Sequence, residues 1–233
     1  MFKGPILKPE SRLMMDAPPL IPAIDLLYRR YLNDESSAAF VDAVTAHYRI
    51  STLVRLAQAG QPVTRRAAVL ALGFIAEYSV NETLGRALSD SDRAVRVLAE
   101  HGIRQVWFRQ GDENQQRLVK QCSRFNTRGE YGDAIELASA IIDCGGSEIG
   151  EAFHQRANAL FAVSQFEEAI EDYRETLYLN RYHFLAAIGL ANCHLQTDDV
   201  SEALASFRLS LTMHPDLESV RGQIARLAKI VEG

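Results

Sequence analysis

The sequence predicts an all-α protein built from pairs of helices, and three observations lead to this prediction. From about Ile24 onward, apolar residues recur at intervals of three and four, which is the period of a helix with one buried face. Strict alternation of apolar and polar residues, which is typical of a half-buried strand, is absent from the sequence. The third observation is a segment that occurs three times in the second half of the chain, at spacings of 35 and 34 residues.

Composition and charge are those of a folded protein with two unlike regions. The 233 residues are 47% hydrophobic, which is enough for a packed core. Residues 1–111 hold 14 basic and 11 acidic side chains, a balance of +3, whereas residues 112–233 hold 11 and 19, a balance of −8. The net charge of −5 is therefore unevenly distributed, and we expect the two regions to differ in character.

The first 23 residues are predicted to form an extended arm, because proline lacks a backbone N–H and discourages helix and sheet interiors. Five of the seven prolines fall here: Pro5, Pro9, Pro18, Pro19 and Pro22. The arm lacks the apolar run of roughly 7 to 15 residues that a secretory signal needs, and no run of about 18 apolar residues could span a bilayer. Cys122, Cys144 and Cys193 have no disulfide or metal spacing. We expect a cytoplasmic protein with free thiols.

Residues 24–111 contain a faint repeat. The segments 63–77 and 94–108 superimpose at an offset of 31, which aligns Arg65 with Arg96. The stretch SDSDRAVRVLAE, in which Asp90 precedes Arg96 by six residues, resembles the second helix of a HEAT repeat. That resemblance implies a structural role for Asp90 and Arg96, in hydrogen bonds between successive repeats.

The second half carries the stronger repeat. Ala134, Ala169 and Ala203 occupy equivalent positions, and each follows a bulky residue by three positions. In the preceding helices, small Cys122, Ala157 and Ala191 align in the same way. Small residues let neighbouring helix backbones approach, while large ones fill the gaps between them.

This pattern resembles the tetratricopeptide repeat (TPR), with units at 115–149, 150–183 and 184–217 and a capping helix at 218–232. The resemblance implies a right-handed α-α superhelix in which the HEAT-like helices precede the three TPR units. It also gives structural repeat positions, which are Ala134, Ala157, Ala169, Tyr173, Ala191, Ala203, Phe207 and Pro215.

Five acids lie within QFEEAIEDYRE, residues 165–175, and raise the question of an acid-base or metal site. At 100° per residue they point away from Phe166, Ala169 and Tyr173, so we expect them to form a solvated face. The histidines are scattered without metal-ligand spacing. No catalytic residue, metal or cofactor is predicted, and the protein is not expected to be an enzyme.

Arginines make the first half mildly basic and suggest an alternative, a helical repeat that binds nucleic acid or nucleoprotein. The residues concerned are Arg65, Arg66, Arg93, Arg96, Arg104 and Arg109. Nearby acids, the small net charge and the lack of interleaved aromatic residues for base stacking make nucleic acid binding the weaker hypothesis.

The TPR resemblance implies that the first helices of the units line a concave groove that holds a peptide or helix of a partner protein. The matching positions are Val119, Ser123, Asn126, His154, Asn158, Phe161, Ile188, Asn192 and Leu195. Asn158 and Asn192 are equivalent, and their amides could bind a peptide backbone or, alternatively, could face solvent or bond within the stack. Val119 and Ser123 stand where TPR proteins that bind a carboxylate tail need lysine and asparagine, so such a ligand is not expected. The sequence therefore predicts a non-catalytic interaction scaffold, and it identifies neither the partner nor the oligomeric state.

Overall fold

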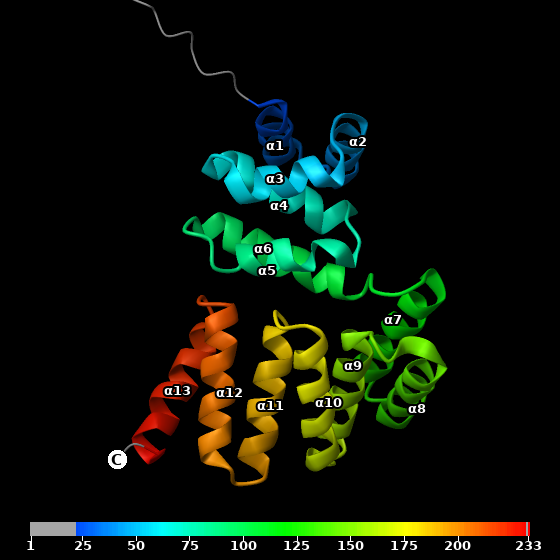
Figure 1. Ribbon diagram of the computed structural model, residues 1–233, viewed down its shortest axis with the longest axis vertical. Helices are drawn as coiled ribbons and strands as arrows, with labels where there is room; N and C mark the ends of the chain where they lie inside the picture. The colour runs from blue at the N-terminus through cyan, green and yellow to red at the C-terminus, as the bar shows by residue number, and fades with distance from the viewer. Residues whose placement is uncertain (1–21, 232) are drawn as a thin grey trace, which may run out of the picture.

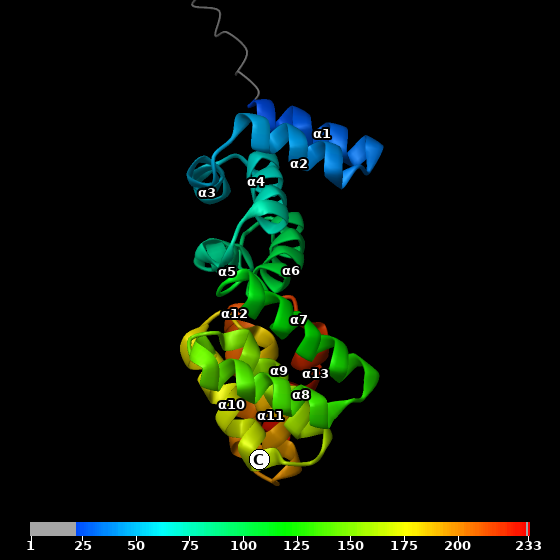
Figure 2. The ribbon, with the colours of Figure 1, turned by 90° about the vertical axis from the view of Figure 1, so that its right-hand side faces the viewer.

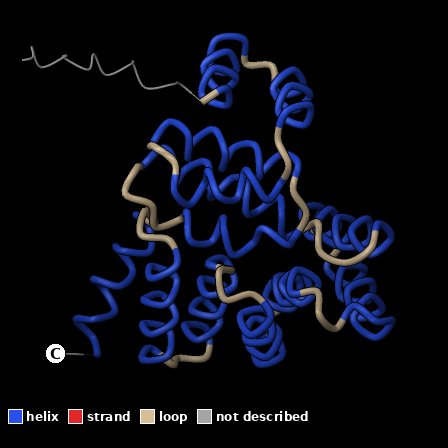
Figure 3. The backbone as a smooth tube through the Cα atoms, turned by 45° about the horizontal axis from the view of Figure 1, so that its top comes forward, coloured by secondary structure: helices blue, strands red, loops and turns tan. Residues whose placement is uncertain are grey.

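The computed structural model describes residues 22–231 and residue 233, and every regular element within them is a helix (Figure 3). The all-α prediction is thereby confirmed. The predicted arm lies outside the described residues except for its last two positions.

The N-terminal region consists of six α-helices and one 3-10 turn, in the upper part of Figure 1. They are α1 (Ala23–Asp34), α2 (Ser37–His47), α3 (Ile50–Ala59), α4 (Pro62–Ile75), η1 (Tyr78–Val80), α5 (Asn81–Ala87) and α6 (Arg93–Trp107). Local residues determine where two of these helices begin. Pro62 occupies the first turn of α4, and the side chain of Asp92 accepts a hydrogen bond from the Val95 amide at the start of α6.

Helices α4 and α6, which carry the two superimposed segments, pack directly against each other. They approach most closely at Gly73 and Gly102, where a Cβ added to Gly73 would lie 2.7 Å from the Gly102 Cα. Any side chain here would force the two backbones apart, so glycine is required for the approach rather than for its backbone freedom.

The C-terminal region is a row of helices that runs across the lower part of Figure 1. It comprises α7 (Glu113–Arg128), α8 (Tyr131–Ile141), a π-helical turn (Ile142–Gly146), α9 (Gly150–Ala162), α10 (Phe166–Leu179), α11 (Phe184–Gln196), α12 (Val200–Met213) and α13 (Glu218–Val231). Helices α9 and α11 begin at the residues where the second and third units were predicted to begin. The small residues of the repeat, including Ala157, Ala169 and Ala191, are fully buried between helices.

The acidic helix α10 departs from its prediction at one position. Glu167, Glu168 and Glu171 are exposed and Glu175 is half-buried, as a solvated face requires. Asp172 is buried instead, and its carboxylate accepts two hydrogen bonds from the Arg156 guanidinium, at 2.7 and 2.8 Å. Helical geometry alone could not reveal this ion pair, because Arg156 comes from the neighbouring helix α9.

The two regions meet along α5 and α6, which lie across the ends of the C-terminal helices (Figure 2). The connections after α10 and α12 pack against this layer: Asn180 accepts a hydrogen bond from Asn81, and Asp216 binds Arg96 at 2.7 Å. His214 in the second connection lies 3.1 Å from Glu100 of α6. The repeat pattern did not predict these contacts, and they create a concave corner between α6 and the first helices of the TPR-like units.

Candidate functional site

A groove runs along the concave corner and consists of two adjoining pockets. The junction pocket, of about 410 Å³, lies between α6 and helices α7, α9 and α11. The repeat pocket, of about 310 Å³, lies between α9, α10 and α11. His154, Asn158 and Leu185 line both pockets, so the two form one continuous groove.

Seven of the nine predicted groove residues line these pockets. Ser123, Asn126, His154 and Asn158 line the junction pocket, and Phe161, Ile188 and Asn192 line the repeat pocket together with His154 and Asn158. The other two predicted residues, Val119 and Leu195, do not line these pockets. Val119 is 1% exposed and packs in a core cluster with Cys122, and Leu195 packs beside the apolar cluster of α11, α12 and α13. Val119 therefore fills a space between helices, and Leu195 is half-buried beside the cluster.

The two asparagines, equivalent in sequence, have different surroundings. The amide oxygen of Asn158 accepts a hydrogen bond from the Tyr173 hydroxyl at 2.8 Å, and its amide nitrogen faces His154 Nε2 at 3.4 Å. Asn158 is therefore hydrogen-bonded within the helix stack, which is the alternative that the sequence offered to a peptide contact. Asn192 is half-buried and lines the repeat pocket.

The junction pocket also contains a buried carboxylate that the sequence reasoning missed. Glu151, on the first turn of α9, is 3% exposed. Its carboxylate accepts hydrogen bonds from Gln155 Nε2 at 2.6 Å, from His154 Nδ1 at 3.1 Å and from His183 Nε2 at 3.1 Å. The only signal in the sequence was the spacing of Glu151 and His154, one helical turn apart.

Neighbouring groups fix where the histidine protons lie. Nδ1 of His183 accepts a hydrogen bond from the Ala186 backbone amide at 3.0 Å, so the ring proton sits on Nε2 and points at Glu151. Burial lowers the pKa of His183 to about 4, which keeps this ring neutral at pH 7. On His154, the Asn158 amide nitrogen faces Nε2, and the proton on Nδ1 is donated to Glu151.

The same contacts determine the charge of Glu151. Burial alone would raise the pKa of Glu151, but its interactions with His154 and His183 outweigh burial and hold the pKa below its usual range. The carboxylate is therefore ionised.

Glu151, His154 and His183 bring their potential ligand atoms within 4.8 Å of one another, which raises the question of a metal centre. A histidine that binds a metal normally donates its other ring N–H to an acceptor. Nδ1 of His183 faces a backbone N–H instead, so binding a metal through Nε2 would set two donors against each other. The arrangement fits a hydrogen-bonded network better than a metal site.

Trp107, at the end of α6, forms a wall of the junction pocket. Its ring stacks on His183 with centroids 3.9 Å apart, and its Nε1 donates a hydrogen bond to Asn81 at 3.0 Å. Across the pocket, Asn126 donates to the Gln155 carbonyl and side-chain oxygens at 2.8 and 3.0 Å. The Asn126 Oδ1 atom is buried and has no hydrogen-bond partner.

The arginines behind the nucleic acid hypothesis are mostly engaged within the protein. Arg65 and Arg66 form two-pronged ion pairs with Asp90 and Asp92, and Arg96 pairs with Asp216. Arg96 also donates to the Asp90 backbone carbonyl at 2.8 Å. Arg109 donates to the Ala76 carbonyl, which leaves Arg93 and Arg104 with exposed side chains.

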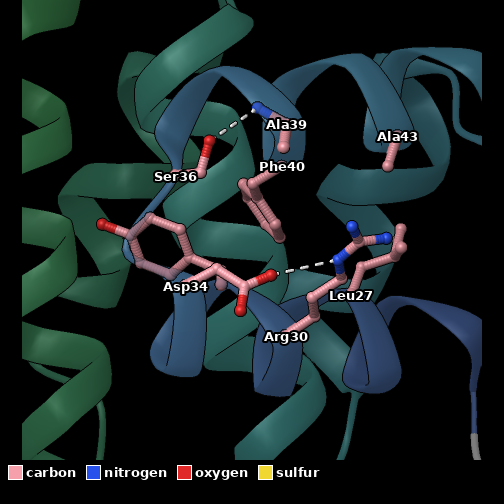
Figure 4. A pocket seen from close by; sticks show the side chains of 8 residues that line it. Leu27, Arg30, Asp34, Ser36, Ala39, Phe40 and Ala43 are labelled. Atoms are coloured by element: carbon pink, nitrogen blue, oxygen red, sulfur yellow. Dashed lines mark hydrogen bonds and ion pairs between the residues drawn. The ribbon is translucent and has the colours of Figure 1, made fainter.

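The small cavity between α1 and α2, drawn in Figure 4, has a different character. Its volume is about 20 Å³, and it is bordered by the Arg30–Asp34 ion pair and by Ser36, which accepts a hydrogen bond from the Ala39 amide. A space of this size holds about one water molecule. It offers no room for a ligand side chain.

No protein-family model matches the chain. Solved structures similar to it include the first TPR domain of Spaghetti (RPAP3) bound to an HSP90 peptide, with a TM-score of 0.49 and 17% identity, over 53% of this chain and 97% of that one. The TPR2AB domain of yeast Sti1 in complex with pHSP90 gives a TM-score of 0.46 and 14% identity, over 91% and 98% of the two chains. A type III secretion complex (T3SS) from Aeromonas hydrophila gives 0.45 and 16%, over 52% and 81%.

Identities and TM-scores this low do not transfer a function from those proteins to this chain. Two of the three are TPR domains, and the HEAT-like assignment of residues 24–111 gains no support from them and stays a prediction. Among residues 22–231, no helix is long and apolar enough to cross a membrane.

Proposed function

We propose that this protein is a non-catalytic interaction module that holds a segment of a partner protein in its groove. The observation that carries the proposal is the continuity of the two pockets along the first helices of successive units. Phe161, Leu185 and Ile188 offer apolar contacts, while Asn192 offers an amide that can both donate to and accept from a peptide backbone. A groove with this lining suits an extended peptide or one face of a helix.

The chemistry of the described residues supports a scaffold over an enzyme. The His183 Nδ1 lone pair accepts from the Ala186 amide, and His154 Nε2 faces the Asn158 amide nitrogen, so neither ring presents a free lone pair that could act as a general base. Burial raises the pKa of the Cys122 thiol to about 11 and that of Cys193 to about 12, so neither forms a thiolate at neutral pH.

The alternative, nucleic acid binding, rests on fewer residues than the sequence suggested. A protein that neutralises phosphates needs cationic side chains free to release counterions. Arg65, Arg66 and Arg96 are paired with aspartates, so Arg93 and Arg104 would carry most of the contact.

Selection of short random peptides on the immobilised protein tests the proposal. Peptides that bind the groove should lose affinity about tenfold or more for Asn192→Arg, which fills the repeat pocket with a larger charged side chain. Asn114→Arg is the matched control, because Asn114 is exposed on α7 and lines neither pocket.

Failure to select any peptide, or equal affinity of the wild type and Asn192→Arg, would contradict the groove proposal. Binding of duplex DNA at about 150 mM salt that is lost in an Arg93→Gln, Arg104→Gln double variant would instead favour the nucleic acid hypothesis.

A further inference from the structure

We infer that the junction pocket binds a basic side chain, lysine or arginine, of the peptide held in the groove. This inference rests on the proposed function and names the chemistry that one part of the site recognises.

The first argument is a buried negative charge that pairs with no lysine or arginine among the described residues. Glu151 is ionised and buried, and it accepts hydrogen bonds from Gln155, His154 and His183, of which the Gln155 amide and the His183 ring are uncharged at pH 7. Its ion-pair contacts are with the two histidines. A buried carboxylate without a permanently charged partner is unfavourable, so the pocket favours a ligand that brings a positive charge.

The second argument is that the unused hydrogen-bonding atoms of the pocket are acceptors rather than donors. Of the two Glu151 oxygens, Oε1 accepts from both His154 and Gln155, whereas Oε2 accepts from His183 alone and keeps a lone pair. Asn126 Oδ1, in the same pocket, is buried without a partner. Both are acceptors. An ammonium or a guanidinium carries only donors, so it can donate to these atoms and adds no further unpaired acceptor.

The walls of the pocket suit the rest of a long basic side chain. Trp107 and Phe108 line it, and an aromatic face attracts a cation placed over it. The indole N–H of Trp107 is already committed to Asn81, so the indole presents its ring and not a competing donor. Leu185 provides an apolar surface for the methylene stem of lysine or arginine.

Arg104 opposes a basic ligand and sets a limit on its affinity. This side chain also lines the pocket, is 52% exposed and lies 3.9 Å from Glu100. Solvent and salt screen an exposed charge more strongly than a buried one. The attraction to Glu151 therefore outweighs the repulsion from Arg104, and removing Arg104 should strengthen binding.

The continuity of the groove indicates a side chain of a bound peptide rather than a free amine. His154, Asn158 and Leu185 border both pockets, so a peptide seated in the repeat pocket carries its neighbouring residue to the mouth of the junction pocket. Backbone contacts in one pocket then position the charged group in the other.

The test uses peptides selected on the wild-type protein, with each arginine replaced by citrulline or each lysine by norleucine. Citrulline keeps the size of arginine, norleucine keeps the carbon chain of lysine, and both remove the charge. Trp107 is the only tryptophan of the chain and lines the junction pocket, so its fluorescence reports occupancy directly. We expect one basic position whose neutralisation weakens binding about tenfold or more and removes the change in Trp107 emission.

Variants assign that effect to the pocket. In Glu151→Gln the affinity ratio between the basic and neutral peptides should fall to about one, because the buried charge is gone. Since this substitution also sets an amide N–H against the histidine donors, a second pair avoids the network: Ser123→Lys should weaken the basic peptide severalfold and Ser123→Glu should strengthen it. Arg104→Gln should strengthen binding by about threefold.

Equal affinity for the basic and neutral peptides would overturn the inference, as would a preference for acidic residues at that position or the same ratio in Ser123→Lys and Ser123→Glu. The proposed function would stand in each of these cases if Asn192→Arg still weakened binding about tenfold or more. Failure to select any peptide would instead remove the proposed function on which the inference rests.

Discussion

The N-terminal helices and the C-terminal groove differ in whether their charged side chains are paired within the protein. On α4 and α6, arginines that give the first half its positive balance are paired with aspartates: Arg65 with Asp90 and Arg66 with Asp92. In the groove, Glu151 is buried and pairs with His154 and His183, and with no lysine or arginine among the described residues. The charge available to a ligand in the groove therefore lies on one buried carboxylate, which the charge balance of the two halves does not reveal.

The difference shows that a count of charged residues does not measure a surface potential. Aspartate and arginine that meet across a repeat cancel each other and stabilise the stack, whereas a carboxylate without a lysine or arginine partner keeps charge that a ligand can meet. Substitutions in the two regions should therefore change the free energy of unfolding by different amounts and for different physical reasons.

The largest effect is expected at Trp107, where the two regions meet. Its ring packs on His183 and Phe184, and its N–H binds Asn81. Trp107→Ala should lower the free energy of unfolding by about 3–5 kcal/mol, because it leaves a cavity and removes the only indole donor of the junction. Urea unfolding measures this. Phe74→Ala, at a partly exposed ring of α4, is the control. A loss for Trp107→Ala no larger than that of the control would contradict the expectation that the contact between the two regions contributes most to stability.

A smaller effect should follow from acid. Because the pKa of His183 is about 4 in the folded protein and about 6.5 when unfolded, the unfolded chain binds the extra proton as the pH falls through this window. Stability therefore rises with pH, and we expect a loss of about 2 kcal/mol between pH 7 and pH 5. Glu151, with its lowered pKa, acts in the same direction at lower pH.

Thermal unfolding at both pH values measures the loss, and His183→Asn provides the comparison. Asparagine keeps an acceptor for the Ala186 amide but does not titrate, so this variant should be less stable at pH 7 and less sensitive to acid. Equal stability of the wild type at pH 7 and pH 5 would show that His183 accepts a proton inside the fold.

The smallest effect concerns the arginine pairs. The Arg65 and Asp90 side chains are 16% and 14% exposed, and Arg65→Met should cost about 1–2 kcal/mol. Arg30→Met is the matched control, because Arg30 and Asp34 are 74% and 52% exposed, and an exposed pair contributes about 0.5 kcal/mol or less. Chemical denaturation compares the two variants, and equal losses would mean that burial of the inner pair adds nothing.

The helices and their pairing were predictable because they depend on spacing along the chain. Ala134, Ala169 and Ala203 mark the positions where helices approach, and each is fully buried. Most groove positions followed from the same alignment. Val119 did not, because the alignment places a residue on a helix without showing how far the next helix covers it.

The buried network could not be predicted in this way, because its members come from different elements. Glu151 and His154 lie on α9, but His183 follows 32 positions after Glu151, in the connection between α10 and α11. Asp172 was misplaced for the same reason, since its partner Arg156 belongs to another helix. Chemistry shared across helices requires the three-dimensional arrangement.

The packing of the late connections against α5 and α6 has a consequence for how the molecule unfolds. In an open stack each repeat contacts only its neighbours, so the ends fray and unfolding spreads inward one unit at a time. Here Arg96 binds Asp216, 120 residues away, and Asn81 binds Asn180, 99 residues away. The last units therefore depend on the early helices for part of their stability. Unfolding of the early helices should therefore destabilise the last units, and the reverse should also hold. Cooperative unfolding should extend over most of the described helices.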